Sequence, residues 1–277
     1  MELIEYQNPT EFFQDISLFI KENFISHYLL FKTIDRILKR QEDIYYCCTV
    51  KNKLNIEIIY IYTNRGYFFY GNTQSKLAVN LLSKRITKEQ FGNESMLFGN
   101  TFIIDIFIHD KGLIFKNIRH RFYMSLKTCN YENKKIEGEL FIANELDYDS
   151  LVPLKIEFYN EEFEGKGSQT EEEIRTNFKM ELQTDGTYYL KVNNQITTMI
   201  SATTLPGQKI YISSIYTSPN FRYKGFSKFA LGTLLNELFD SGNTEIGLNV
   251  KVSNKDAIGL FSSLGMIKIY ETGFYEI

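Results

Sequence analysis

The sequence of 277 residues lacks tryptophan and contains only four prolines, three cysteines and three histidines. So few prolines, beside 17 glycines, exclude a chain built of linkers or low-complexity segments. The odd cysteine count, with Cys47 next to Cys48 and Cys129 far away, argues against a disulfide framework and suits no metal site. We therefore expect buried free thiols in a reducing compartment.

Long apolar runs are missing as well. No segment is apolar over the roughly 20 residues that a membrane-spanning helix needs. The first residues lack the basic start and apolar core of a signal peptide. These absences predict a cytoplasmic chain without a membrane partner. No histidine follows His120 and no cysteine follows Cys129, which excludes nucleophilic catalysis by a Cys–His pair in the second half.

Charge is divided unevenly along a chain of net charge −3. Residues 1–130 carry 17 basic and 13 acidic side chains, a balance of +4, whereas residues 131–277 carry 14 and 21, a balance of −7. Neither half is basic enough for a nucleic-acid partner. A length of 277 residues and a hydrophobic share of 43% suit one large or two small globular domains. The acidic half favours a cationic substrate over an anionic one.

The most informative stretch is a predicted strand, loop and helix. The strand is Lys209–Thr217, rich in β-branched and aromatic residues, and Pro219 ends it. A helix is expected from Gly225 to Asp240, because its apolar residues recur every three or four positions. These apolar residues are Phe226, Ala230, Leu231, Leu234, Leu235 and Leu238.

The loop between them has features of a phosphate site. Amide groups at the start of a helix have no partner within the helix and lie at the positive end of its dipole. Gly225 allows a ligand to approach the backbone closely. Arg222, Lys224 and Lys228 add positive charge. The alternative is an ordinary strand-to-helix turn with solvated basic side chains.

Two motifs resemble those of the GNAT acetyltransferase superfamily. The loop resembles its acyl-CoA motif [QR]-x-x-G-x-[GA], with Arg222 and Gly225 in place but Ser227 where Gly or Ala is usual. The preceding strand matches the lead-in to Pro219, with Thr217 in place of Val. A second family pattern, L-x-V-x-x-x-N-x-x-A-x-x-L-Y-x-x-x-G-F, is matched at Leu248, Val250, Asn254, Ala257, Leu260 and Gly265, with Phe261 for Tyr and Met266 for Phe.

The resemblance covers about residues 136–277 and implies a cofactor site. Acetyl-CoA, as co-substrate, would lie along the fourth strand, in the gap where that strand splays from the fifth. The pantetheine arm would contact strand backbone, and the pyrophosphate would bind loop amides. The residues implied are Ile215, Tyr216, Thr217, Arg222, Tyr223, Lys224, Gly225, Phe226, Ser227, Lys228 and Asn254. Asn254 also stands where a helix N-cap would be.

The implied reaction is direct attack of an amine on the thioester. Relatives often use the Tyr at the position of Phe261 to protonate the leaving thiolate, and a phenyl ring has no proton to give. A thiol pKa near roughly 8.5 allows unassisted departure. The candidate donors are Tyr211, Tyr216, Ser214 and Tyr270, and ordinary strand packing is the alternative for each. The base would be a glutamate or an ordered water.

The first half predicts a related order of elements. Its elements are one long or broken helix at 10–40 with Thr10 as cap, strands at 43–50, 54–62 and 67–70, a helix at 74–83, an ambiguous segment at 101–110, and strands at 113–115 and 119–126. If 101–110 is a helix, this order is close to that of residues 187–277. We therefore interpret residues 1–130 as a degenerate copy of the same fold, without the phosphate loop. Generic α+β elements of unrelated origin are the alternative.

The second half begins with further elements. They are a strand at 138–144, helices at 150–160 and 170–182 with Pro153 in a first turn, a hairpin around Asn193-Asn194, and closing strands at Met266–Tyr270 and Gly273–Ile277. Six glutamates flank the connection between the two helices: Glu161, Glu162, Glu164, Glu171, Glu172 and Glu173. Relatives place their acceptor pocket near this connection, but a solvated helix face is the favoured interpretation, because glutamates at a helix start also suit the helix dipole.

The sequence thus predicts an α+β chain of two GNAT-like domains, 1–130 and 131–277, each a mixed, mostly antiparallel twisted sheet flanked by helices. The leading hypothesis is an N-acetyltransferase that acts on a small-molecule or peptide amine. A noncatalytic acyl-CoA-binding or regulatory protein is the alternative, because Phe261 removes the usual acid. An aminoacyl or peptidyl transferase is a third, against which the largely intact loop argues. Acyl length and oligomeric state are open.

Overall fold

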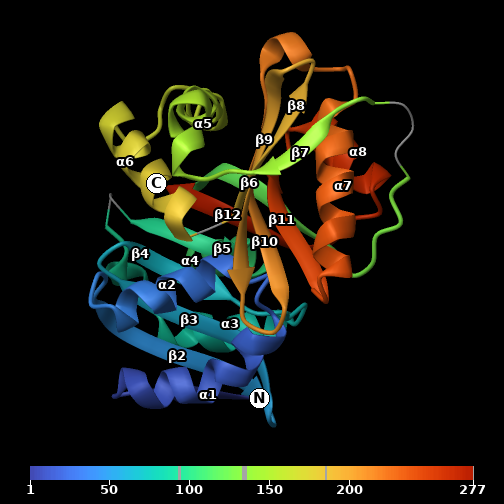
Figure 1. Cartoon of the computed structure of the whole chain (residues 1–277). Helices are drawn as coiled ribbons and strands as arrows, with labels where there is room; N and C mark the ends of the chain where they lie inside the picture. Colours follow the sequence, from blue (N-terminus) through green and yellow to red (C-terminus); the bar gives the residue numbers. More distant parts are fainter. Residues whose placement is uncertain (93–94, 133–135, 185, 277) are drawn as a thin grey trace. The chain divides into compact units, whose positions relative to one another are not determined.

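The computed structural model describes residues 1–92, 95–132, 136–184 and 186–276 (Figure 1). Within these residues, no helix combines the length and the apolar composition needed to cross a bilayer. The same described residues contain no group of three or more histidine, cysteine or acidic side chains that could hold a metal ion. Cys47 and Cys48 are buried free thiols, as predicted, and Cys129 is a partly buried one.

The chain folds into two compact units, and its end returns to the first. Unit 1 consists of Met1–Met124, Val250–Lys255 and Lys268–Ile277, and unit 2 of Ser125–Asn249 and Asp256–Ile267. The boundary lies near residue 124, whereas the sequence predicts it at residue 130. No local pattern in the sequence indicates that the two late segments join the first unit.

Unit 1 is a sheet covered by helices on both faces. Its strands lie in the order β1-β2-β3-β4-β5-β12-β6. Neighbours are antiparallel from β1 to β4 and at β5–β12, and parallel at β4–β5. Its elements are β1 (Glu2–Glu5), α1 (Pro9–Glu22), α2 (Tyr28–Leu38), β2 (Ile44–Asn52), β3 (Asn55–Thr63), β4 (Gly66–Tyr70), α3 (Lys76–Arg85), β5 (Met96–Asn100), α4 (Thr101–Lys111), β6 (Lys116–Leu126) and β12 (Ile267–Glu276).

Alternation along the strands divides the apolar residues of unit 1 between its two faces. Cys48, Val50 and Tyr60 point to the face covered by α3 and α4, where Phe69 and Phe107 complete a buried cluster. The opposite face is covered by α1, whose Phe12 ring packs against Tyr6. Burying each such side chain contributes about 1.5–3 kcal/mol, so these two layers hold the unit together.

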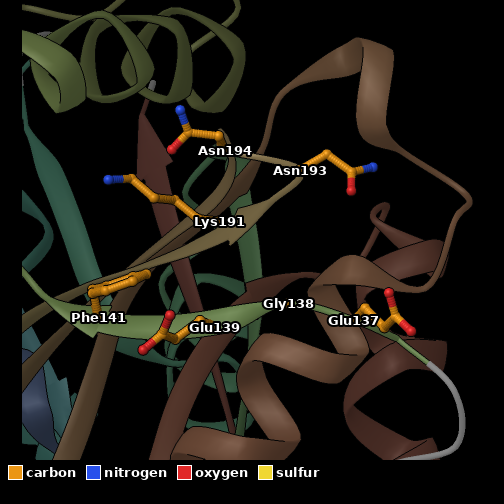
Figure 2. Close-up of a pocket in the computed structure, with 7 residues that line it drawn as sticks. All are labelled: Glu137, Gly138, Glu139, Phe141, Lys191, Asn193 and Asn194. Carbon is orange, nitrogen blue, oxygen red and sulfur yellow. The ribbon is translucent and has the colours of Figure 1, made fainter.

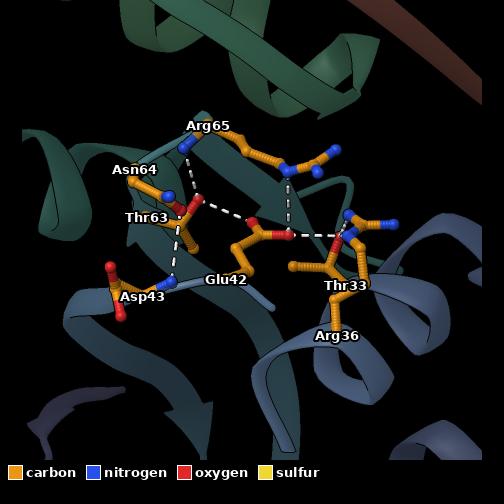
Figure 3. A network of polar contacts seen from close by, with 7 residues as sticks. All are labelled: Thr33, Arg36, Glu42, Asp43, Thr63, Asn64 and Arg65. Atoms are coloured by element: carbon orange, nitrogen blue, oxygen red, sulfur yellow. Dashed lines mark hydrogen bonds and ion pairs between the residues drawn. The ribbon is translucent and has the colours of Figure 1, made fainter. Parts of the chain in front are cut away.

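A buried carboxylate joins α2 to the strands of unit 1 (Figure 3). The Glu42 side chain is fully buried. Arg36 Nε donates to it at 2.7 Å, Thr63 Oγ1 donates at 2.7 Å, and Arg65 Nε lies 3.6 Å away. A buried charge is tolerated only when it is paired in this way, so removing one partner would destabilise the unit strongly.

Unit 2 is an antiparallel hairpin sheet extended by one parallel strand. Its strands lie in the order β7-β8-β9-β10-β11, antiparallel throughout except at β10–β11. Figure 1 shows α5 and α6 on one side of this sheet and α7 on the other. The elements are β7 (Glu139–Ile142), α5 (Tyr148–Glu162), α6 (Glu171–Thr184), β8 (Gly186–Val192), β9 (Gln195–Leu205), β10 (Lys209–Thr217), α7 (Phe226–Asp240), β11 (Glu245–Lys251) and α8 (Lys255–Ser263).

The same order of ten elements occurs twice along the chain. The first ten are β1 α1 α2 β2 β3 β4 α3 β5 α4 β6, and the second ten are β7 α5 α6 β8 β9 β10 α7 β11 α8 β12. The predicted α+β class, with a mostly antiparallel sheet flanked by helices, is therefore confirmed. The ambiguous segment 101–110 is the helix α4, capped by the Asn100 side chain.

Most predicted elements are confirmed, and several details are wrong. The strand Lys209–Thr217 has the predicted bounds, and the hairpin turns at Asn193 and Asn194, both with positive φ. Asn8 rather than Thr10 caps α1, because its side chain accepts from the Thr10 amide. Pro153 lies inside α5 rather than in its first turn, and residues 113–115 do not form a strand. The two closing strands predicted at Met266–Tyr270 and Gly273–Ile277 are one strand, β12, and Ile277 lies outside the described residues.

Candidate functional site

Strands β10 and β11 separate partway along their length. They pair in parallel from Lys209–Ile212 to Glu245–Leu248. A bulge then interrupts the pairing of β10 with β9 between Ile212 and Ser214. Beyond it, β10 continues to Thr217 in register with β9, and no further β11 partner occurs among the described residues. The backbone that the sequence assigns to pantetheine, Ile215 to Thr217, lies in this separated part.

The loop after β10 opens α7 without a side-chain cap. A short 3₁₀ turn, Pro219–Phe221, follows the strand. Gly225 is the N-cap residue of α7 and adopts a left-handed conformation, φ +83°. Because glycine has no side chain to accept a hydrogen bond, the N-cap side chain satisfies none of the first-turn amides of α7. The predicted residues Phe226, Ser227 and Lys228 form that first turn.

Arg222 holds the loop against the end of β10. Its Nε donates to the Thr217 carbonyl at 2.9 Å, and its Nη2 donates to Glu161 of α5 at 2.6 Å. The guanidinium also lies 5.3 Å from the centre of the Tyr216 ring. The Glu161 carboxylate raises the pKa of Arg222, which therefore stays charged. Arg222 thus has a structural role, and its charge is already balanced by a carboxylate.

Two of the four positions that depart from the family motifs, Thr217 and Ser227, contact each other. Thr217 Oγ1 and Ser227 Oγ lie 2.6 Å apart, and Thr217 Oγ1 lies 2.9 Å from Thr198 Oγ1 of β9. This chain of hydroxyls joins two strands to the first turn of α7. Thr217 and Thr198 are buried, where such bonds are favoured because water is excluded. Thr198 is a residue that no motif in the sequence indicated.

A second polar cluster lies on the other face of β10. Lys155 Nζ, from α5, donates to both Glu181 oxygens of α6 at 2.9 and 2.7 Å and to Ser214 Oγ at 3.1 Å. Lys155 and Glu181 are mostly buried side chains. The cluster fixes α5 and α6 to the strand next to its bulge. Neither residue was predicted, because they are 26 positions apart and match no motif.

Two of the candidate proton donors of unit 2, Tyr211 and Ser214, contact other side chains. The Tyr211 hydroxyl contacts the Asn249 side chain of β11, and Ser214 accepts from Lys155. Burial, and next the Glu157 carboxylate, raise the pKa of Tyr216 to about 12, so its hydroxyl is protonated at neutral pH. Phe261 is a buried ring of α8.

Two further predicted residues belong to unit 1. The Tyr270 hydroxyl, in β12, donates to the Gly71 carbonyl at 2.9 Å and accepts from the Gly71 amide at 3.3 Å. Its ring centre lies 4.4 Å from that of buried His27. Burial raises the pKa of Tyr270 well above its ordinary value. Asn254 directly precedes α8, which is the position of an N-cap.

Several glutamates between α5 and α6 have structural partners. Glu161 binds Arg222, and Glu171 binds Arg175 with 2.6 Å between Oε1 and Nη2. The Glu173 carboxylate accepts from the Thr170 amide at 2.7 Å while the Thr170 hydroxyl accepts from the Glu173 amide, a reciprocal helix cap. These contacts favour the helix-face interpretation over a cation-binding surface.

A surface hollow of about 380 Å³ lies outside the strand–loop–helix region (Figure 2). It is bounded by β7 and by the turn between β8 and β9. Lys191 Nζ lies there 5.2 Å from the centre of the Phe141 ring. Its lining includes none of the predicted site residues.

A family model and several solved structures resemble this chain. Residues 151–266 match the model of the acetyltransferase (GNAT) family, a segment that holds β10, the loop, α7 and α8. No curated protein matches the chain.

The solved structures match nearly the whole fold. A GNAT-family acetyltransferase from Colwellia psychrerythraea has a TM-score of 0.60 at 10% identity, with 100% of both chains covered. A Drosophila protein has a TM-score of 0.60 at 11% identity, covering 99% of this chain and 98% of its own. A GCN5-related N-acetyltransferase from Sphaerobacter thermophilus has a TM-score of 0.56 at 12% identity, covering 83% and 80%. At such identities the likeness shows the fold alone.

Proposed function

Because residues 151–266 match the model of the acetyltransferase (GNAT) family, we propose that this chain transfers an acetyl group from acetyl-CoA to an amine. The observation that carries the proposal is the combination of a separated strand pair with an uncapped helix at its end. The gap beyond Ile212 gives the pantetheine arm strand backbone to bind, and the Gly225 turn gives the pyrophosphate outward amides.

The proposed chemistry is a direct transfer. The neutral amine attacks the thioester carbonyl carbon, a carbon–nitrogen bond forms, and the carbon–sulfur bond breaks. The amine loses one proton to a base, and the thiolate leaves with the electron pair of its bond. Strand amides in the gap would stabilise the oxyanion. Tyr216, whose pKa is near 12, remains a protonated hydroxyl on β10 and is a donor candidate in unit 2.

Only unit 2 is proposed to bind the cofactor. The repeated order of elements supports the interpretation of residues 1–130 as a degenerate copy. In unit 1 the helix after the fourth strand is α3, and its N-cap Ser75 accepts from the Ala78 amide. A helix start that is capped by its own side chain leaves fewer amides for an anion.

The test is a pair of substitutions at Gly225. Gly225→Glu and Gly225→Ala share the same backbone strain at φ +83°, but only glutamate adds a negative charge and bulk at the pyrophosphate. We expect Gly225→Glu to lower affinity for acetyl-CoA by at least about 100-fold, equivalent to about 2.7 kcal/mol, and Gly225→Ala by far less. Calorimetric titration measures both, with circular dichroism as the control for folding. Unchanged affinity in Gly225→Glu would refute the loop assignment.

A noncatalytic acyl-CoA binder is the second candidate, favoured by the buried phenyl ring of Phe261. Turnover of acetyl-CoA with a panel of small-molecule and peptide amines separates the two. Binding together with turnover supports the transferase, and binding with no turnover across the panel supports the binder.

A further inference from the structure

Tyr223 is an exposed aromatic residue in the middle of the loop. Its side chain is 92% exposed, compared with 59% for Tyr45, the other large exposed tyrosine on the described surface. It also has a left-handed backbone, φ +59°. An exposed ring gains nothing from burial, and a side chain at positive φ costs free energy. Tyr223 therefore stabilises the folded unit little through its ring.

The ring is nevertheless held in one direction. The Tyr223 hydroxyl donates to Asp256 Oδ2 at 3.2 Å. Asp256 lies in the first turn of α8, where the helix dipole stabilises a carboxylate. The bond ties the loop before α7 to the start of α8 and leaves both faces of the ring open. The neighbouring Arg222 and Lys224 side chains point elsewhere, to Glu161 and to the Asn220 carbonyl.

The path of the cofactor places its nucleotide near this ring. This step rests on the proposed function. If the pantetheine arm follows β10 and the pyrophosphate binds the first-turn amides of α7, the adenosine leaves on the outer side of the loop. Tyr223 is the exposed aromatic residue of the loop, and Lys228 supplies positive charge in the first helical turn. We propose that the Tyr223 ring is the stacking platform for the adenine base of the acyl-CoA.

The test compares a whole cofactor with a truncated one. Base–aromatic stacking is worth about 5- to 150-fold in affinity. Tyr223→Ala should raise Kd for acetyl-CoA by about tenfold and leave Kd for S-acetyl-4′-phosphopantetheine, which lacks the adenosine, within about twofold. Tyr223→Phe keeps the ring and should stay close to wild type. Tyr45→Ala, at an exposed tyrosine of unit 1, is the matched control and should change neither Kd.

The absence of tryptophan provides a second readout. Tyr223→Trp introduces a single indole into the chain. Acetyl-CoA should quench its emission by stacking, and the phosphopantetheine thioester should not. Equal weakening of both ligands by Tyr223→Ala, or no weakening of either, would overturn the stacking role. If the wild type binds neither ligand, the proposed function itself fails and this role fails with it.

Discussion

Helices α7 and α3 occupy the same place in the repeated order of elements, but they begin differently. The N-cap of α7 is Gly225, whereas the N-cap of α3 is Ser75, whose side chain accepts from the Ala78 amide at 3.4 Å. A serine cap satisfies an amide that an anion would otherwise bind. One residue at a helix start therefore distinguishes a candidate anion site from a closed helix end within the same topology.

The strands before these two helices also differ, in whether the backbone groups at their ends are bonded to other parts of the protein. Beyond Ile212, the end of β10 lies in register with β9 and has no further β11 partner among the described residues. Beyond β4, the Gly71 amide and carbonyl bind the Tyr270 hydroxyl, and Asn100 Nδ2 donates to the same carbonyl at 3.3 Å. In unit 1, side chains thus occupy the backbone groups that a ligand would use.

The largest expected effect is on turnover, at Phe261. If the leaving thiolate lacks an acid, Phe261→Tyr should keep or raise kcat, by up to the about 10²–10⁴-fold that a positioned general acid contributes. Ring volume is nearly unchanged, which matters because Phe261 is buried. The measurement is turnover of both proteins over a pH series with the best amine. A high wild-type rate and a severe loss in the variant would show that Phe261 packs the acyl pocket.

Tyr270→Phe tests whether the Tyr270 hydroxyl has a structural role in unit 1, where it binds the Gly71 backbone. Removing the hydroxyl takes the acceptor from the Gly71 amide and one donor from the Gly71 carbonyl, so the free energy of unfolding should fall by about 1–3 kcal/mol. We expect kcat to be unaffected. Urea denaturation measures stability, and Tyr45→Phe at an exposed tyrosine is the control. A loss of kcat by a factor of about 100 at unchanged stability would instead identify Tyr270 as the proton donor.

The pH dependence of stability provides a related test. Burial lowers the pKa of His27, packed on Tyr270, to about 3. Between about pH 6.5 and 3 the unfolded chain therefore binds a proton that the folded chain does not, and stability falls as pH falls. The expected loss from pH 7 to pH 5 is about 2 kcal/mol. His27→Phe should remove this part of the slope in urea denaturation, and an identical slope in both proteins would contradict the assignment.

The smallest effect concerns the hydroxyl pair of unit 2. Thr217→Val and Ser227→Ala each restore the family motif at one position and break the 2.6 Å contact. Each single change should therefore weaken acetyl-CoA binding or stability, and the double change should cost less than their sum. We expect a coupling of about 1 kcal/mol in a double-mutant cycle. Strict additivity would mean that the contact does not position the loop.

Local patterns predicted the second half well. The bounds of β10 and the position of α7 follow from β-branched content, Pro219 and a four-residue apolar period. The short strand β5 was missed because it is only five residues long and ends in Gly99 and Asn100, which favour a turn.

Contacts between distant residues could not be predicted from one sequence. Pairing of β12 with β5 joins residues 172 to 180 positions apart, from Thr272 with Asn100 to Glu276 with Met96, and no local pattern encodes it. The same holds for the Tyr270–Gly71 bonds and for Lys155 with Glu181. At the candidate site, the motif named Thr217 and Ser227 as departures, but only the structure shows that they contact each other.

The most direct test of the account is the stoichiometry of cofactor binding. We predict that calorimetric titration of the full chain with acetyl-CoA gives one site per chain, and that Gly225→Glu removes it. The full chain is required because a fragment of residues 1–130 would lack β12, which pairs with β5. Two sites in the wild type, or a saturable site that persists in Gly225→Glu, would contradict the claim that only unit 2 binds the cofactor.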